Sequence, residues 1–313
     1  MTKISSLAVA ILLGLCLLVP PAQAQLARTF VSSLGNDAND CGRLTPCRTF
    51  QIAHNNTLPA GEITVLDPGG YGAVTITKGI SIINDGVGEA GALVSGGLNG
   101  ITINAGANDR ITLRGITVKG IGFGGGNGIV FQSGRFLSIE NCVVRNLTGT
   151  AQNQFIGYGI IFNSNSASEL AVSNTVVTDN EGHGISVVPS FNARVLFSSV
   201  QVYKNGLHGI VLATNGALIQ GTADNSISSF NGFSGFAVEG NGPTSLMVSR
   251  SVATSNGTAF SHLSGSGTLR VSRSNIAYNN ATWTGSVASY GDNDVRGNGD
   301  GDIAAPLGIV TKK

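Results

Sequence analysis

The chain has 313 residues, of which 42% are hydrophobic and 11% are charged, and its formal net charge at pH 7 is +1. So few basic side chains leave no positively charged stripe that would release counterions from phosphates, which argues against a nucleic-acid partner. The hydrophobic fraction likewise excludes a disordered chain, because it supplies enough apolar surface for a core.

The first 24 residues are predicted to be an export signal. Lys3 precedes an apolar run over about residues 7–19, and small residues up to Ala24 have the pattern of a cleavage site. The run is too short for a good membrane span, and no other segment is apolar enough to cross a bilayer. We therefore expect cleavage after Ala24 and a mature protein that is secreted, periplasmic or held at the cell surface.

Residues 25–60 are predicted to form an N-terminal cap with a disulfide. Cys41 and Cys47 lie six positions apart among turn residues, and an oxidising compartment lets them close a small loop. A zinc site is the alternative, although no third or fourth ligand lies nearby in the sequence. A short helix is expected over about residues 48–55. Because a stack of parallel strands exposes unpaired backbone at its ends, this segment would cover the first turn.

Residues 61–290 contain a repeat that predicts a solenoid. A glycine followed by two apolar residues returns about every 25 residues, at Gly100, Gly128, Gly159, Gly184, Gly209 and Gly235. Between these points apolar residues alternate with Ser, Thr and Asn, which is the period of a β-strand. Repeated strands without helices between them predict an all-β fold, a parallel β-helix from about Ile63 to Ile276. In its first turns the inward residues are expected to be Ile63, Val65, Val74, Ile76, Ile80 and Ile82.

An asparagine column supports this register. The second half of each repeat ends at an asparagine, giving the series Asn146, Asn180, Asn205, Asn231, Asn256 and then Asn279 or Asn280. Stacked about 4.8 Å apart, their amides would bond to one another and to the turn backbone. Asn also tolerates the left-handed conformation of a tight corner. The same count places Cys142 beside Val176 and predicts a buried core thiol.

The cap and the repeats together resemble a known group of proteins. The order TFVS and GND from Thr29 onward, the PCRTF helix start and the glycine-rich turns resemble the secreted right-handed parallel β-helix proteins of the pectate-lyase-like superfamily. The resemblance covers nearly the whole mature chain and implies a right-handed solenoid. It implies no single activity, because members include lyases, glycoside hydrolases, epimerases and adhesins.

One tripeptide matches a catalytic motif found on this fold. The GHG sequence at residues 182–184 is similar to that of polygalacturonases, which also carry Asn-Thr-Asp, an Asp-Asp pair and Arg-Ile-Lys. Here Asn-Thr is followed by Val176, and the other two motifs are missing from the sequence. The paired-carboxylate mechanism of hydrolysis is therefore not carried over. Carboxylates that would hold the calcium of a pectate lyase are scattered, at Asp179, Glu181 and Asp224.

The repeat register nevertheless brings chemically active residues to one corner. Aligned on the glycines, Tyr158, His183 and His208 share a column; aligned on the asparagines, Arg145, Asp179 and Lys204 share another. An insertion of about nine residues over 147–157 precedes Tyr158 and would overhang both columns. The predicted catalytic residues are His183, His208, Asp179 and Lys204, and the predicted ligand-binding residues are Tyr158, Arg145 and Glu181.

A structural interpretation of this corner stands beside the functional one. The charged residues would then form an exposed ion-pair row of little energetic weight, and the histidines would bond to the backbone. In either case we expect the two imidazoles to lie outside the core, close enough that at least one stays neutral near pH 7.

The last segment, residues 291–313, contains the densest acidic cluster, at Asp292, Asp294, Asp300 and Asp302. Calcium is one interpretation, but Arg296 takes the place of a ligand and no bidentate Glu follows. A polar turn before a last strand over residues 307–310 is preferred. We accordingly predict no metal and no cofactor, with calcium as the alternative.

Two functions follow from these observations. The first is an exported β-helix that binds or cleaves a polysaccharide, as a lyase or glycoside hydrolase if it is an enzyme. The second is a non-catalytic surface or matrix solenoid with a structural or adhesive role. In both cases we expect a monomer with no nucleic-acid partner.

Overall fold

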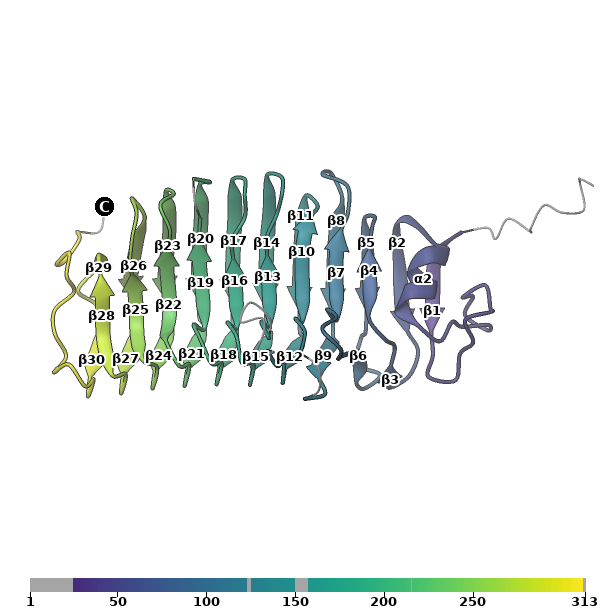
Figure 1. Cartoon of the computed structure of the whole chain (residues 1–313), viewed down its shortest axis with the longest axis horizontal. Helices are drawn as coiled ribbons and strands as arrows, with labels where there is room; N and C mark the ends of the chain where they lie inside the picture. Colours follow the sequence, from purple (N-terminus) through teal and green to yellow (C-terminus); the bar gives the residue numbers. More distant parts are fainter. Residues whose placement is uncertain (1–24, 123–124, 150–156, 215, 312–313) are drawn as a thin grey trace, which may run out of the picture.

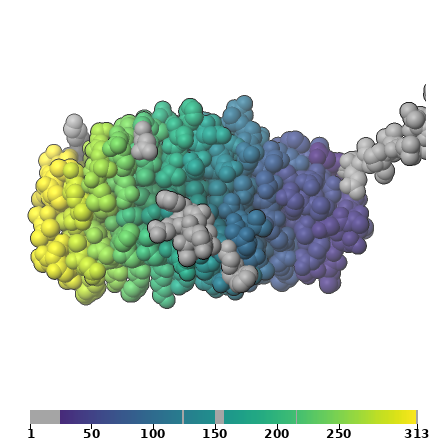
Figure 2. Space-filling model, viewed as in Figure 1, coloured from purple at the N-terminus to yellow at the C-terminus, as the bar shows by residue number. Residues whose placement is uncertain are grey.

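The computed structural model describes residues 25–122, 125–149, 157–214 and 216–311. These residues form a long rod of parallel strands, and one short helix lies at its N-terminal end (Figure 1). Beyond the second strand the chain passes through three sheets in turn, so that every third strand belongs to the same sheet. The prediction of an all-β parallel β-helix is confirmed. In the space-filling view the turns follow one another along the rod without a gap (Figure 2).

Each sheet runs the length of the rod. Sheet A contains β1 (Leu26–Val31), β2 (Thr57–Val65), β5 (Ile80–Ile83), β8 (Arg110–Arg114), β11 (Phe136–Glu140), β14 (Ser168–Ser173), β17 (Ala193–Ser198), β20 (Ile219–Asp224), β23 (Thr244–Ser249), β26 (Thr268–Ser272) and β29 (Val287–Ser289). Sheet B contains β3 (Gly69–Gly70), β6 (Ala90–Val94), β9 (Ile116–Gly120), β12 (Val143–Arg145), β15 (Val176–Thr178), β18 (Gln201–Tyr203), β21 (Ile227–Ser229), β24 (Val252–Thr254), β27 (Asn275–Ala277) and β30 (Asp294–Arg296). Sheet C contains β4 (Val74–Ile76), β7 (Ile101–Asn104), β10 (Ile129–Ser133), β13 (Ile160–Phe162), β16 (Ile185–Val187), β19 (Ile210–Ala213), β22 (Ser234–Glu239), β25 (Thr258–His262) and β28 (Ala281–Gly285).

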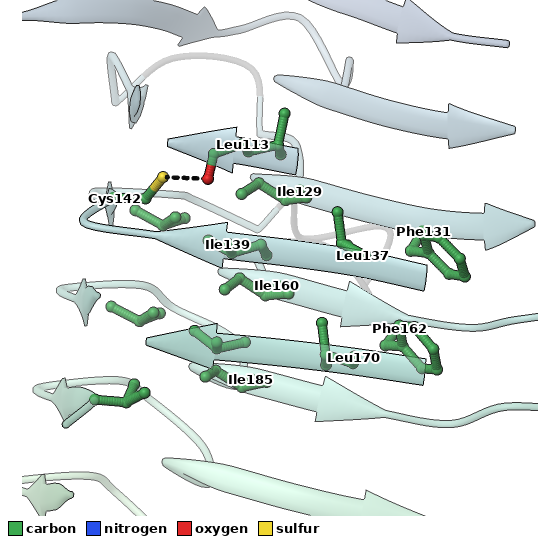
Figure 3. Packing of buried hydrophobic residues seen from close by; sticks show 14 of the residues in the cluster. Leu113, Ile129, Phe131, Leu137, Ile139, Cys142, Ile160, Phe162, Leu170 and Ile185 are labelled. Carbon is green, nitrogen blue, oxygen red and sulfur yellow. Dashed lines mark hydrogen bonds between the residues drawn. The ribbon is translucent and has the colours of Figure 1, made fainter. Parts of the chain in front are cut away.

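The core is a set of identical or similar side chains stacked from turn to turn. The six residues expected to point inward in the first turns are all at most 3% exposed. Further along, Phe131 stacks on Phe162, with ring centroids 4.7 Å apart and planes inclined by 7° (Figure 3). Ile129, Ile160 and Ile185 follow one another in register beside them. Each such side chain contributes roughly 1.5–3 kcal/mol on burial, so the apolar columns carry most of the stability.

The asparagine ladder exists, but its register differs from the expectation at both ends. Its members are Asn180, Asn205, Asn231, Asn256, Asn279 and Asn298. The Nδ2 group of each donates to the Oδ1 atom of the next at 2.9–3.0 Å. In the turn before Asn180 the ladder position is held by Leu147, whose N–H donates to Asn180 Oδ1.

Asn146 and Asn280 therefore lie outside the ladder. Asn146 immediately precedes the ladder position and has a φ of 57°. The equivalent residues of later turns also have positive φ values, between 53° and 57°: Asp179, Lys204, Phe230, Ser255 and Tyr278. The left-handed corner and the ladder are thus two adjacent columns, and the prediction that one asparagine serves both was wrong. The physical reason is that both positions favour Asn, the first for its tolerance of positive φ and the second for its two-way hydrogen bonding.

A second ladder of hydroxyl groups lies at the bend between sheets A and B. Val200 N–H donates to Ser226 Oγ, Ser226 N–H to Ser251 Oγ, and Ser251 N–H to the Oγ of Ser274. Cys142 belongs to this column. It was predicted to lie beside Val176, but Val143 pairs with Val176, so Cys142 lies one residue earlier in the register. Its thiol is 1% exposed and donates to the carbonyl oxygen of Leu113 (Figure 3).

The N-terminal cap closes the first turn. Cys41 and Cys47 form the predicted disulfide, and their backbone groups bond to Phe30 in β1 and to Ser32 just after it. Helix α2 (Phe50–Asn56) lies beside β4, where His54 Nε2 accepts the N–H of Thr77. No helix in the described part of the chain combines the length and apolarity that a membrane crossing requires.

The two neighbouring asparagines 279 and 280 test the ladder directly. Asn279→Ala should lower the free energy of unfolding by about 3 kcal/mol, because buried donors and acceptors on two turns lose their partners. Asn280→Ala, at an exposed position, should change it by less than about 0.5 kcal/mol. Denaturant unfolding of both variants measures the difference, and equal losses would contradict the ladder register.

The cysteines make a separate prediction. Burial raises the pKa of Cys142 to about 11, so its thiol should resist alkylation in the folded protein. Intact-mass analysis of residues 25–313 after alkylation should find no label in buffer and one label in denaturant without reductant. Three labels under the second condition would contradict the disulfide and with it the account of the cap.

Candidate functional site

The bends between sheets B and C, here called the B–C corner, contain the residues that the sequence analysis selected. From Asp179 onward, each bend consists of a left-handed residue, a ladder asparagine and a short segment leading into sheet C. Glycine is needed here for packing. A Cβ atom on Gly182 would lie 1.9 Å from the ring of Tyr158, and one on Gly184 would lie 2.3 Å from Val202 Cγ1. The GHG tripeptide is therefore accounted for by the corner itself.

The predicted column of rings is present. Gly159 N–H bonds to the carbonyl of His183, and Gly184 N–H to that of His208, which places the two imidazoles on successive turns. Their rings are stacked with centroids 5.2 Å apart. Tyr158 packs edge-on against His183 at 4.8 Å, and Phe233 lies 5.5 Å from His208. The four rings form one continuous stack along the corner.

Backbone hydrogen bonds fix the tautomer of both histidines. His183 Nδ1 accepts the N–H of His208 at 3.1 Å, and His208 Nδ1 accepts the N–H of Ser234 at 3.0 Å. Since Nδ1 is an acceptor, the proton of each neutral ring resides on Nε2. Asn127 has the same role at an earlier position of the column, where its Oδ1 accepts the N–H of Tyr158.

Glu239 is a partner that the sequence analysis missed. It lies at the end of β22, and its Oε1 atom is 3.0 Å from His208 Nε2. The hydrogen bond from His208 lowers the pKa of Glu239, so the carboxylate is ionised. Nothing in the local sequence marks it, because Glu239 reads as an ordinary polar residue at the end of a strand.

The expectation that both imidazoles lie outside the core was wrong for His208, which is only 7% exposed. The ring is covered by its stacked neighbours and by Glu239. His183 is partly exposed, and burial, followed by the adjacent His208, lowers its pKa to about 4. One neutral imidazole at pH 7 agrees with the sequence analysis.

The predicted charge column is corrected by one residue. Arg145 pairs in register with Lys119 and Thr178, so it belongs to the outer face of sheet B. The left-handed column is Asn146, Asp179 and Lys204 on successive turns. The error has the same source as that of the ladder, since Arg145 was aligned through Asn146.

A hollow of about 540 Å³, here called the corner hollow, lies beside this column. It is lined by Lys119, Gly120, Ile121, Gly122, Asn146, Leu147, Thr148, Asp179 and Glu181. Glu181 Oε2 accepts the N–H of Gly149, and Asp179 Oδ2 accepts the hydroxyl of Thr178. The structure thus brings Asp179 and Glu181 together, whereas Arg145, Lys204 and Tyr158 are not among the lining residues. The overhang expected over residues 147–157 falls largely on 150–156, outside the described residues.

The C-terminal aspartates bond to the protein itself. Asp300 accepts hydrogen bonds from the backbone N–H and the hydroxyl group of Thr282. Asp302 accepts hydrogen bonds from the backbone N–H and the side-chain amide of Asn298. Asp294 is paired with Arg296. Among the described residues, no group of three or more His, Cys, Asp or Glu side chains is arranged to hold a metal ion.

His183 predicts a pH dependence of stability. The unfolded chain binds this proton near pH 6.5 and the folded chain only near pH 4, so stabilisation that is complete above pH 6.5 should be lost as the pH falls to 4. The loss attributable to this ring is up to about 3 kcal/mol. Urea unfolding at pH 7 and pH 4.5 should show a smaller loss in His183→Asn, which keeps an acceptor at the site as Asn127 does. Equal losses in the two proteins would contradict the assignment.

Comparison with known proteins finds similarity in structure but not in sequence families. No family model matches the sequence, and no curated protein matches it. The structure is similar to that of pectate lyase Pel9A, with a TM-score of 0.55, 17% identity, and coverage of 87% of this chain and 71% of the lyase. The A-module of the Azotobacter vinelandii mannuronan C-5 epimerase AlgE6 is also similar, with a TM-score of 0.42 and 15% identity over 81% of this chain and 91% of the module. The chain therefore has a right-handed parallel β-helix fold, which it shares with pectate lyase Pel9A.

Proposed function

We propose that this protein is exported and binds a polysaccharide at the corner hollow without cleaving it. The observation that carries the proposal is the composition of the hollow. The carboxylates of Asp179 and Glu181, the amide of Asn146 and the ammonium group of Lys119 line the same surface depression. Such a set offers both donors and acceptors to sugar hydroxyl groups.

The surroundings of the hollow favour a long ligand over a small one. The hollow lies on the wall of a rod whose turns repeat along one axis, and solenoids use such surfaces for extended partners. His183 lies two residues beyond Glu181, and its ring contacts that of Tyr158. The partly exposed ring of Tyr158 supplies an apolar surface beside the polar groups. Sugars need both kinds of surface, because each pyranose presents hydroxyl groups at its edge and C–H groups on its faces.

Binding without turnover is favoured by the state of the histidines. General acid–base catalysis needs a group that can take up or release a proton near the working pH. Both Nδ1 lone pairs accept backbone N–H groups, and the Nε2 proton of His208 is held by Glu239. The two imidazoles therefore support the corner and are not available as bases. Pel9A, which shares this fold, is a pectate lyase by name. The choice of a polysaccharide as the ligand of this chain rests on that analogy of fold together with the residues of the hollow.

Native affinity electrophoresis in gels containing polygalacturonate, alginate, xylan or hydroxyethylcellulose tests this proposal. We expect retardation by at least one polymer and at least a tenfold loss of affinity, about 1.4 kcal/mol, in Asp179→Asn/Glu181→Gln. The control Asp85→Asn/Glu89→Gln removes the same charge from exposed residues three turns before Asp179, at the bend between sheets A and B, and should bind as the wild type does. Absence of retardation in every gel, or equal binding by the first variant, would contradict the proposal.

The same polymers are to be assayed for new reducing ends and for unsaturated products, with calcium and with a chelator. No product is expected in either condition. Product formation that is lost in His183→Asn would instead identify the corner as an active site and replace the proposal by an enzymatic function.

A further inference from the structure

Two aromatic residues occupy backbone positions that disfavour them. Phe230 and Tyr278 belong to the left-handed column of the B–C corner, with φ values of 55° and 57°. Large side chains rarely adopt this conformation, which costs roughly 1–2 kcal/mol for each residue. Asparagine, aspartate or glycine would be the ordinary choice, and Asn146, Asp179 and Gly297 are found at this position in other turns. Strain of this kind is often retained where it serves a function.

Both rings are also turned toward solvent. Phe230 is 60% exposed and Tyr278 is 67% exposed. Neither ring stacks on another aromatic ring among the described residues, although one edge of Tyr278 approaches Gly297. Core packing therefore offsets little of the backbone strain at either position. The stability of the fold gives no reason for two exposed rings in this column.

The two residues belong to one column of backbone positions that runs along the rod. Phe230 N–H bonds to the carbonyl of Thr254, and Ser255 N–H bonds to that of Ala277, so Phe230, Ser255 and Tyr278 occupy successive turns. We call these three residues the aromatic ridge. At a strand spacing of about 4.8 Å the backbone positions of the two residues are roughly 10 Å apart, and one small hydroxyl residue lies between them.

We propose that the aromatic ridge is a second carbohydrate-binding surface, which takes a neutral, extended β-linked glycan along the axis of the rod. In such a glycan alternate sugar units present the same face, and the distance between them is close to two turns of this solenoid. Two alternate units would then stack on Phe230 and Tyr278, and the unit between them would lie over Ser255. Stacking of this kind is sequence-independent and tolerant of the sugar type.

The chemistry of the ridge separates this partner from two others. The strand residues that immediately precede its three members are Ser229, Thr254 and Ala277, none of which is charged. Charged side chains lie beyond both ends of the ridge, at Lys204 one turn before Phe230 and at the Asp294–Arg296 ion pair one turn after Tyr278, so an acidic polymer gains little along the ridge itself. A hydrophobic protein partner would need a contiguous apolar patch, and Ser255 interrupts the ridge between the two rings. The corner hollow, in contrast, is lined by three charged side chains, the nearest of which in this column, Asp179, lies two turns before Phe230. The ridge is thus a different site from the hollow and goes beyond the function proposed for it.

Asparagine substitutions separate binding from stability. Phe230→Asn/Tyr278→Asn removes both rings and installs residues that tolerate positive φ, so the thermal midpoint should stay equal or rise. Retardation in hydroxyethylcellulose or xylan gels should fall at least tenfold. Ser255→Asn, in the same column, is the matched control: its thermal midpoint should likewise stay equal or rise, and its retardation should not change. Phe230→Tyr/Tyr278→Phe keeps both rings and should bind as the wild type does.

The results distinguish this inference from the function proposed for the hollow. A loss of affinity confined to Phe230→Asn/Tyr278→Asn would support the ridge and contradict the hollow, and a loss confined to Asp179→Asn/Glu181→Gln would support the hollow and contradict the ridge. Unchanged retardation of Phe230→Asn/Tyr278→Asn, or no retardation of the wild type by either neutral polymer, would overturn the inference. So would a change in sedimentation coefficient on ridge substitution, because it would identify a second protein copy as the occupant.

Discussion

The fold depends on how each sharp bend satisfies its backbone N–H groups. A solenoid that turns within one or two residues leaves N–H groups that no strand partner faces, and burying them unpaired would cost about 1–3 kcal/mol each. Here a side-chain acceptor from an adjacent turn takes them. Asparagine Oδ1 atoms serve the B–C corner, serine hydroxyl groups serve the bend between sheets A and B, and imidazole Nδ1 atoms serve the entry to sheet C. The three ladders let apolar columns stack behind them without a break.

The ladders do not run in the same direction. In the asparagine ladder the N–H of an earlier turn reaches a side chain of the next turn, as from Asn205 to Asn231. In the imidazole column the N–H of a later turn reaches back, as from His208 to His183. Successive turns are consequently tied from both sides of the same corner. This reciprocity gives the stacked histidines a structural role that is independent of any ligand.

Much of the fold could be predicted from the sequence, because glycine spacing and strand alternation are local patterns. The register at the corner was less accessible. Asn146 was assigned to the ladder since a corner position and a ladder position both favour asparagine, and a one-residue error then misplaced Arg145. The pairing of His208 with Glu239 was beyond reach, because it joins residues whose separation exceeds one repeat. The tautomer of His183 likewise depends on a backbone group of the next turn.

The position of Leu147 has a consequence for how such a chain can vary. Leu147 stands where later turns have a ladder asparagine, and the longest addition to the B–C corner follows directly after it. A corner whose asparagine is hydrogen-bonded to the turns on both sides has no room for extra residues, since each extra residue would move a hydrogen-bond donor away from its acceptor. Length can therefore change by whole turns, or at corners released from the ladder. Variation in related chains should concentrate at such interruptions, and a break in the ladder marks where a solenoid is free to acquire a new surface.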